Sequence, residues 1–288
     1  MELDLVGVGS GGVAVLDIHP IRPSIIDRVY AALKILFTDL LPGIFSSNLP
    51  NALTWVYRTW CTRTLTCHTL VTQAGGAAKA ARLFSHGKVD PRPGGDLPAL
   101  LLLHGDQSHP FTLLHLADIA QEQGRAVFSV HLPYDDEHPE RHRSLLSQSI
   151  DKIDQIIGAR GGKLSNLVLA GHSRGAMEAA NEAFAVNNPK VSGVIAIAGR
   201  FKVISPSARP CRPSLEASVN ALWEKIGHWN QSLRVPFYQI AAKKDWCMDP
   251  EASIVRTDHE HLYVDAGHLG VINHPSTLNQ FRVWLAKF

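Results

Sequence analysis

The sequence has few of the features that mark disulfide-rich and membrane-spanning proteins. Its 288 residues include only four cysteines, and none of these forms a CxxC pair. A chain of this length can bury a core without covalent cross-links, so we expect free thiols. No apolar run approaches the ~20 residues that a membrane-spanning helix requires, and the glycine-interrupted N-terminus is unlike a secretory signal. The sequence therefore predicts a soluble, cytoplasmic protein.

An excess of charge of one sign is also missing. The chain has 28 basic and 26 acidic residues, for a formal net charge of +2, and they are scattered along its length. Proteins that bind nucleic acid gather lysine and arginine on one surface, so nucleic acid is not an expected partner. A hydrophobic content of 45% is sufficient for a buried sheet in an ordinary globular protein.

From about residue 98 onward, short apolar runs alternate with segments of helical periodicity. The predicted strands are residues 98–103, 125–132, 166–170, 191–198, 236–241 and 261–264. The first strand is continuously apolar, which is typical of a strand covered by helices on both faces. Leu146, Ile150 and Ile157 lie on one helical stripe that Gly161 and Gly162 should end. This alternation predicts an α/β fold with a mostly parallel central sheet flanked by helices.

Two parts of the chain do not follow this alternation. Residues 1–95 are predicted to form a partly helical N-terminal extension that packs on or covers the core. Within it, residues 24–41 combine a capping box with an apolar helical stripe. Whether the extension is a subdomain or adds early strands to the main sheet is left open. Residues 200–232 are predicted to form a small flap within a catalytic domain that spans residues 96–288.

A Gly171-His172-Ser173-Arg174-Gly175 sequence lies between a predicted strand and a predicted helix. In a G-x-S-x-G turn the glycines avoid clashes, and the strained backbone pushes the serine hydroxyl outward. The helix that follows directs its positive N-terminus, including the Arg174 backbone N–H, toward a developing oxyanion.

With this context on both sides of the motif, residues 96–288 resemble the α/β-hydrolase superfamily, particularly its esterases and lipases. The resemblance implies a nucleophile, an acid and a histidine, in that order along the chain. Ser173 matches the nucleophile, Asp245 in the loop after strand 236–241 best matches the acid, and Asp249 is the reserve. His268 matches the histidine, because Gly267-His268 follows the last predicted strand.

Two further histidines, His259 and His261, are weaker candidates for the base. They lie before or at the start of the last strand, whereas the site is expected at the carboxyl ends of the strands. The resemblance also implies a second oxyanion donor in the loop after strand 98–103. The backbone N–H of Asp106 is aligned with that donor, and Gln107 is next in line. Ser108 departs from lipases that carry another glycine at this place.

Neither a metal nor a cofactor is expected. The acidic and histidine-rich residues 135–142 lack a sharp ligand spacing, so we interpret them as a solvated loop. The glycine-rich residues 7–12 are interpreted as a turn rather than a phosphate-binding loop. Five cations are expected on loops at the rim of the pocket, where they could attract an anionic substrate group or simply be solvated. They are Arg174, Arg200, Lys202, Lys243 and Lys244.

The leading functional hypothesis is an ester hydrolase that acts on a small-molecule ester or lipid-like substrate through an acyl-serine intermediate. Gln107 and Arg200 are the candidate substrate-binding residues. The alternatives are an acyltransferase that uses the same triad and a non-catalytic interaction or lipid-sensing module. Peripheral contact with a membrane is compatible with such substrates, and the oligomeric state is not predicted.

Overall fold

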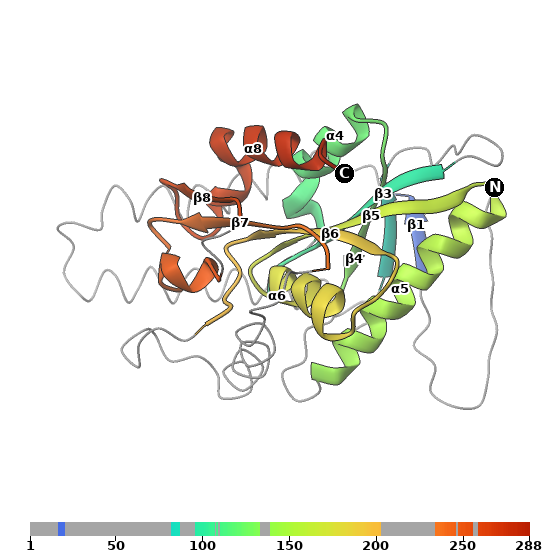
Figure 1. The fold of residues 1–288 in the computed structure, drawn as a ribbon, viewed down its shortest axis with the longest axis horizontal. Coiled ribbons are helices and arrows are strands. Elements are labelled where there is room, and N and C mark those ends of the chain that lie inside the picture. The colour runs from blue at the N-terminus through green and yellow to red at the C-terminus, as the bar shows by residue number, and fades with distance from the viewer. Residues whose placement is uncertain are drawn as a thin grey trace.

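The protein is built on an eight-stranded sheet with the strand order β1-β2-β4-β3-β5-β6-β7-β8 (Figure 1). The computed structural model describes residues 17–20, 82–86, 96–106, 108, 110–132, 139–202, 234–245, 247–255 and 259–288. The strands are β1 (Asp17–Pro20), β2 (Arg82–His86), β3 (Asp96–Leu103), β4 (Ala126–His131), β5 (Lys163–His172), β6 (Val191–Ile197), β7 (Phe237–Ala242) and β8 (His261–Val264). Neighbouring strands are parallel except β2 and β4, which are antiparallel.

All six predicted strands are present, which confirms the expected mostly parallel α/β architecture. Strand β5 begins at Lys163, three residues before the predicted start. Its first residues pair with the beginning of β3 but are at least partly exposed, so no apolar run marked them. Strands β1 and β2 come from the first 95 residues and extend the main sheet next to β4. The predicted helix at 24–41 lies outside the described residues.

Helices cover both faces of the sheet (Figure 1). One face carries α5 (Pro139–Ala159) and α6 (Arg174–Ala180), and α6 continues into a π-helical turn, η3 (Asn181–Ala185). The other face carries α4 (Leu114–Glu122), preceded by the turn η2 (Pro110–Leu113), and α8 (Pro275–Leu285). The remaining short turns are η4 (Pro250–Ser253) and η5 (Gly270–Asn273).

The two helical layers explain the continuously apolar sequence of β3. Leu101 and Leu103 pack into the core cluster that contains the α5 stripe, whereas Leu100 and Leu102 pack into the cluster that contains α4 and α8. Successive side chains of a strand point to opposite faces, so a strand between two helical layers is apolar at every position.

The ends of the helices follow the sequence signals. Helix α5 ends where predicted, because Gly161 has a φ of 77° and Gly162 N–H returns to the Ile157 carbonyl. The C-terminal segment docks through polar contacts as well as apolar ones. Arg125 donates to the Leu285 carbonyl at 2.9 Å, and Asn166 donates to the Phe288 carbonyl at 2.9 Å. The first of these bonds reaches a carbonyl of the last turn of α8, which has no intrahelical partner.

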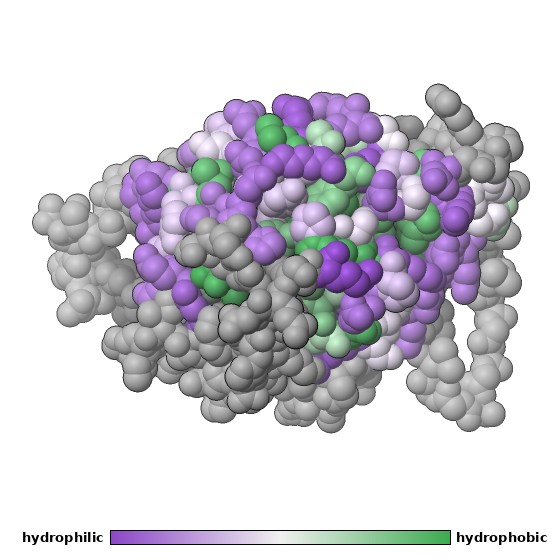
Figure 2. Space-filling model, viewed as in Figure 1, coloured by the Kyte–Doolittle hydropathy of each residue, from purple (hydrophilic) through white to green (hydrophobic). Residues whose placement is uncertain are grey.

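On the face shown in Figure 2, most described residues are hydrophilic, with apolar side chains near the middle and in smaller groups elsewhere. Within the described part of the chain, no helix combines the length and the apolar character needed to cross a membrane.

Most of the predicted flap, from residue 203 to residue 232, lies outside the described residues.

Candidate active site

Ser173 occupies a strained turn between the carboxyl end of β5 and the start of α6. Its φ and ψ angles are 55° and −119°, a conformation that a residue with a side chain rarely adopts. The Ser173 N–H donates to the Ile197 carbonyl on the neighbouring strand β6 at 2.9 Å, and its own carbonyl accepts the Ala176 N–H at 3.1 Å. The strain is thus supported by hydrogen bonds to the sheet and to the helix.

The burial pattern singles out the same residue. Every residue from Leu167 through Ala183 is buried except Ser173, which is partly exposed. The turn therefore lifts one hydroxyl out of an otherwise solvent-excluded strand and helix. A side chain that must meet a substrate needs this exposure, as predicted for the G-x-S-x-G motif.

Two glycines of the motif are required by direct backbone contacts. A Cβ atom on Gly171 would lie 2.2 Å from the Gly175 carbonyl oxygen, and one on Gly175 would lie 2.2 Å from the Leu103 carbonyl oxygen. Real Cβ atoms do not approach other atoms this closely, so α6 can pack on the ends of β5 and β3 only without these side chains.

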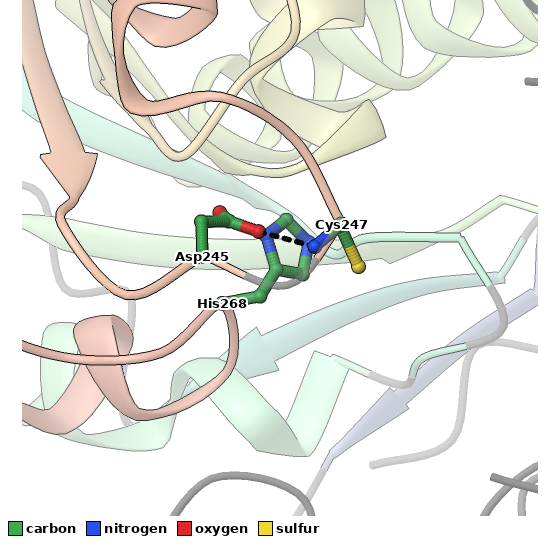
Figure 3. A group of neighbouring side chains, drawn as sticks. All are labelled: Asp245, Cys247 and His268. Atoms are coloured by element: carbon green, nitrogen blue, oxygen red, sulfur yellow. Dashed lines mark hydrogen bonds and ion pairs between the residues drawn. The ribbon is translucent and has the colours of Figure 1, made fainter. Parts of the chain in front are cut away.

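His268 and Asp245, on the loops that follow β8 and β7, are hydrogen-bonded to each other (Figure 3). The distance between His268 Nδ1 and Asp245 Oδ2 is 2.6 Å, and both side chains are almost completely buried, with exposed fractions of 6% and 1%. The second oxygen, Oδ1, accepts the N–H groups of Cys247 at 2.7 Å and Met248 at 3.2 Å. Charge-assisted bonds of this kind hold a carboxylate in one orientation.

The alternative residues make other contacts. Asp249 starts the turn η4, where its carbonyl accepts the Ala252 N–H. His261 is exposed at the beginning of β8 and contacts the His259 carbonyl, whereas His268 follows the end of that strand. Asp245, and not Asp249, is therefore the residue that is hydrogen-bonded to His268. His268 follows the carboxyl end of its strand, as Ser173 does.

His172 links the two halves of this site, a contact that the sequence analysis missed. Its Nε2 lies 2.8 Å from the His268 carbonyl oxygen, to which it donates, and the two rings lie 4.8 Å apart between centroids. Because His172 is bonded to Ser173 through the main chain, this contact ties the Ser173 turn to the His268 loop. Its place next to the serine in the G-x-S-x-G motif was the available signal.

The loop after β3 lies against Ser173. A Cβ atom on Gly105 would lie 3.0 Å from the Ser173 Cβ, so Gly105 leaves little space beside the Ser173 side chain. His104 holds this loop, since its Nδ1 donates to the Gly105 carbonyl at 2.7 Å and its Nε2 accepts the Leu132 N–H at 3.1 Å. Asp106 follows in a turn and is partly exposed, and Gln107 lies outside the described residues.

The prediction that the Arg174 side chain lies at the rim of the pocket is wrong, because this side chain is buried. The residue is only 4% exposed, and its Nη2 donates to His142 Nδ1 on α5 at 3.2 Å. It also lies 3.9 Å from the carboxylate of Glu178. His142 is fully buried in α5, so its interpretation as part of a solvated loop is also wrong. The guanidinium is long enough to reach back between α5 and α6, where these polar partners compensate its burial.

The other expected rim cations differ in their exposure. Arg200 is buried, with an exposed fraction of 8%, and Lys202 is partly exposed. Lys243 and Lys244 are exposed, and Lys244 forms an ion pair with Asp265 at 3.0 Å. The role of Arg200 in binding substrate stays a prediction.

Burial raises the pKa of Glu178 to about 7, although Arg174 and Arg143 oppose the shift. Glu182, which also faces this region, raises the pKa further and is itself bonded to Ser147 and Asn188. A protonated carboxyl is less costly to bury than a carboxylate, so the α5–α6 interface contains a group that titrates near neutral pH.

The sequence matches no family model and no curated protein. Solved structures nevertheless resemble it. The monoacylglycerol lipase of Paleococcus ferrophilus is 16% identical, with a TM-score of 0.50 over 68% of this chain and 96% of that chain. The thermophilic esterase Est2 of Thermogutta terrifontis is 14% identical (TM-score 0.53; 72% and 86%), and Est1E from Butyrivibrio proteoclasticus is 12% identical (TM-score 0.53; 72% and 93%). The chain thus has the α/β-hydrolase fold that its motifs suggested.

Replacing Gly175 by alanine should disrupt the Ser173 turn, because the added Cβ would overlap the Leu103 carbonyl. We expect Gly175→Ala to lower the free energy of unfolding by ~4 kcal/mol or more, or to prevent folding. Gly158→Ala is the matched control, since Gly158 lies on α5 with nothing within 4 Å of an added Cβ. That variant should gain ~0.5–1 kcal/mol in denaturant unfolding. Equal stability of the two variants would contradict the close contact.

Glu178→Gln should change how stability depends on pH. The folded protein holds the Glu178 proton more tightly than the unfolded chain does, because its pKa is raised from 4.5 to about 7. The stabilisation is complete below the unfolded pKa and is lost as the pH rises through the folded pKa. We therefore expect the variant to gain on the order of 2 kcal/mol relative to wild type between pH 5 and pH 8. Denaturant unfolding at both pH values measures this gain, and the exposed Glu122→Gln serves as the control.

Proposed function

We propose that the protein is a serine ester hydrolase in which Ser173, His268 and Asp245 act as nucleophile, general base and orienting acid. The observation that carries the proposal is the 2.6 Å bond between His268 and Asp245. His172 ties the His268 loop to the turn that holds the strained and partly exposed Ser173. A serine hydroxyl becomes a nucleophile when an imidazole removes its proton, and a carboxylate fixes the tautomer of that imidazole.

The reaction follows from this arrangement in two steps. Asp245 accepts a hydrogen bond from the Nδ1–H of His268, which leaves the Nε2 lone pair to take the proton of Ser173 as its oxygen attacks the ester carbonyl. His268 then returns this proton to the leaving alcohol, and an acyl-serine remains. Water, activated by the same imidazole, hydrolyses the acyl-serine and restores the hydroxyl. The buried Asp245 stabilises the imidazolium in both steps.

Backbone N–H groups are the proposed oxyanion donors. Arg174 is the first residue of α6, so its N–H belongs to the positive end of the helix. Asp106 is the proposed second donor because it follows Gly105, which lies close to the Ser173 side chain. Two such donors stabilise the negative oxygen of the tetrahedral intermediate, and each is worth roughly 3 kcal/mol in related sites.

The substrate is proposed to be a small-molecule ester or lipid-like ester, and the enzyme is proposed to be cytoplasmic. An esterase and a monoacylglycerol lipase among the structural neighbours support ester chemistry. No observation on the described residues favours the acyltransferase or the non-catalytic alternative.

Ester hydrolysis is tested with p-nitrophenyl esters of increasing acyl length, from acetate to palmitate. Wild type should release p-nitrophenol from at least part of the series. Ser173→Ala should lose at least ~10³-fold in kcat/KM, because the remaining hydrogen bonds cannot replace covalent catalysis. A fluorophosphonate probe should label wild type at Ser173, and Ser276→Ala, which removes an exposed serine, should label normally. An adduct on another serine of the folded protein would contradict the assignment.

Asp245→Asn should lower kcat by ~10³–10⁴-fold while leaving the fold intact, because the amide cannot stabilise the imidazolium and favours the wrong tautomer. Asp249→Asn is the matched control, since Asp249 lies in the same loop and starts η4. Its rate should stay within about three-fold of wild type, because surface substitutions away from the reacting groups have small effects. A larger loss in Asp249→Asn would transfer the acid role to that residue.

A further inference from the structure

A thiol lies beside the proposed acid and base. Asp245, Cys247 and His268 each offer one ligand atom, and these three atoms lie within 4.8 Å of one another (Figure 3). We propose that these side chains form a binding site for Zn²⁺, and that the bound ion inhibits the enzyme. In the described part of the chain, no other group of three such residues meets this distance.

The donor atoms select the kind of metal. Imidazole nitrogen and thiolate sulfur are preferred ligands of Zn²⁺, and a carboxylate oxygen completes a common mixed set. Mg²⁺ and Ca²⁺ prefer oxygen ligands alone, so a nitrogen and a sulfur among three ligands disfavour them. Cys247 is only half-buried, so an ion can reach its thiol from solvent and then the two buried side chains.

The geometry requires small side-chain adjustments. Ligand atoms of a tetrahedral zinc site lie about 3.3–3.5 Å apart, given bond lengths of about 2.0–2.3 Å. Asp245 Oδ2 and His268 Nδ1 are closer than this at 2.6 Å, and the longest separation in the group is within 4.8 Å. Changes of about 1 Å would bring all three atoms onto one ion, and water would occupy the fourth position.

Binding would remove the lone pair that catalysis needs, an inference that rests on the proposed function. The Cys247 thiol loses its proton to solvent when sulfur binds the ion. If Nε2 of His268 binds the ion, its lone pair is directly occupied. If Nδ1 binds, the ring proton moves to Nε2, so that nitrogen again cannot accept the proton of Ser173. Inhibition follows from either mode.

Co²⁺ is the probe for binding, because a bound thiolate gives it a charge-transfer absorption that nitrogen and oxygen ligands do not. Wild type should show this band at one equivalent of Co²⁺, and Zn²⁺ should abolish it by displacement. Cys247→Ser and His268→Ala should lack the band. The triple variant C61S/C67S/C211S should retain it, because Cys247 is then the only cysteine in the chain.

Several outcomes would overturn the site. They are the absence of the band in wild type, its persistence in Cys247→Ser, and its loss in the triple variant. Binding without a thiolate band would indicate other ligands, such as the exposed His115 and His261, and would exclude Cys247 from the site. This readout does not depend on ester hydrolysis, so the metal site can fail or hold independently of the proposed function.

Inhibition is measured separately, relative to the zinc-free rate of each variant. Zn²⁺ should inhibit hydrolysis of a p-nitrophenyl ester and slow fluorophosphonate labelling of Ser173, and the chelator EDTA should restore both. Cys247→Ser should need at least ten-fold more Zn²⁺ for half-inhibition, while the triple variant should respond like wild type. Equal inhibition of Cys247→Ser and wild type would exclude the thiol from the inhibitory site.

Discussion

The close crossing of helix α6 over the ends of β5 and β3 is the constraint on which the site depends. Gly171 and Gly175 let main-chain atoms meet where side chains would overlap, so the turn between them has little freedom. Ser173 is consequently held at a positive φ and bonded to Ile197 on the next strand. A buried core transmits such contacts rigidly because its packing density leaves few voids. The position of one hydroxyl is thus set by the whole centre of the sheet.

Buried histidines extend this order to the surrounding loops. His104 donates with one ring nitrogen and accepts with the other, so it is neutral and joins the loop after β3 to Leu132 after β4. His172 joins the end of β5 to the His268 loop after β8. Buried polar groups are stabilising when their hydrogen bonds are made. These two rings connect loops that follow separate strands near Ser173. The neutral His104 does so without adding a charge to the site.

The sequence predicted those structural features that depend on residues close together along the chain. Six strands, the end of α5 at Gly161 and the turn at Ser173 were predicted because their signals are local. Strand β2 is only five residues long and pairs antiparallel with β4, so its sequence was too short for a periodic signal. The side chains of Arg174 and Cys247 depend on contacts across the fold, with α5 in one case and His268 in the other. Polar residues of this kind resemble solvated loop residues until the fold is known.

The inward orientation of Arg174 also bears on the kind of ester that fits the proposed site. Its guanidinium contacts His142 and Glu178 between α5 and α6, so Arg174 can offer a substrate its backbone N–H but not its side-chain charge. Lys244 is exposed and paired with Asp265, an arrangement whose field is screened by solvent. A substrate carboxylate or phosphate would therefore gain little attraction from either residue. Any attraction of such a group by the expected rim cations would have to come from Arg200, Lys202 or Lys243, of which Lys243 is exposed.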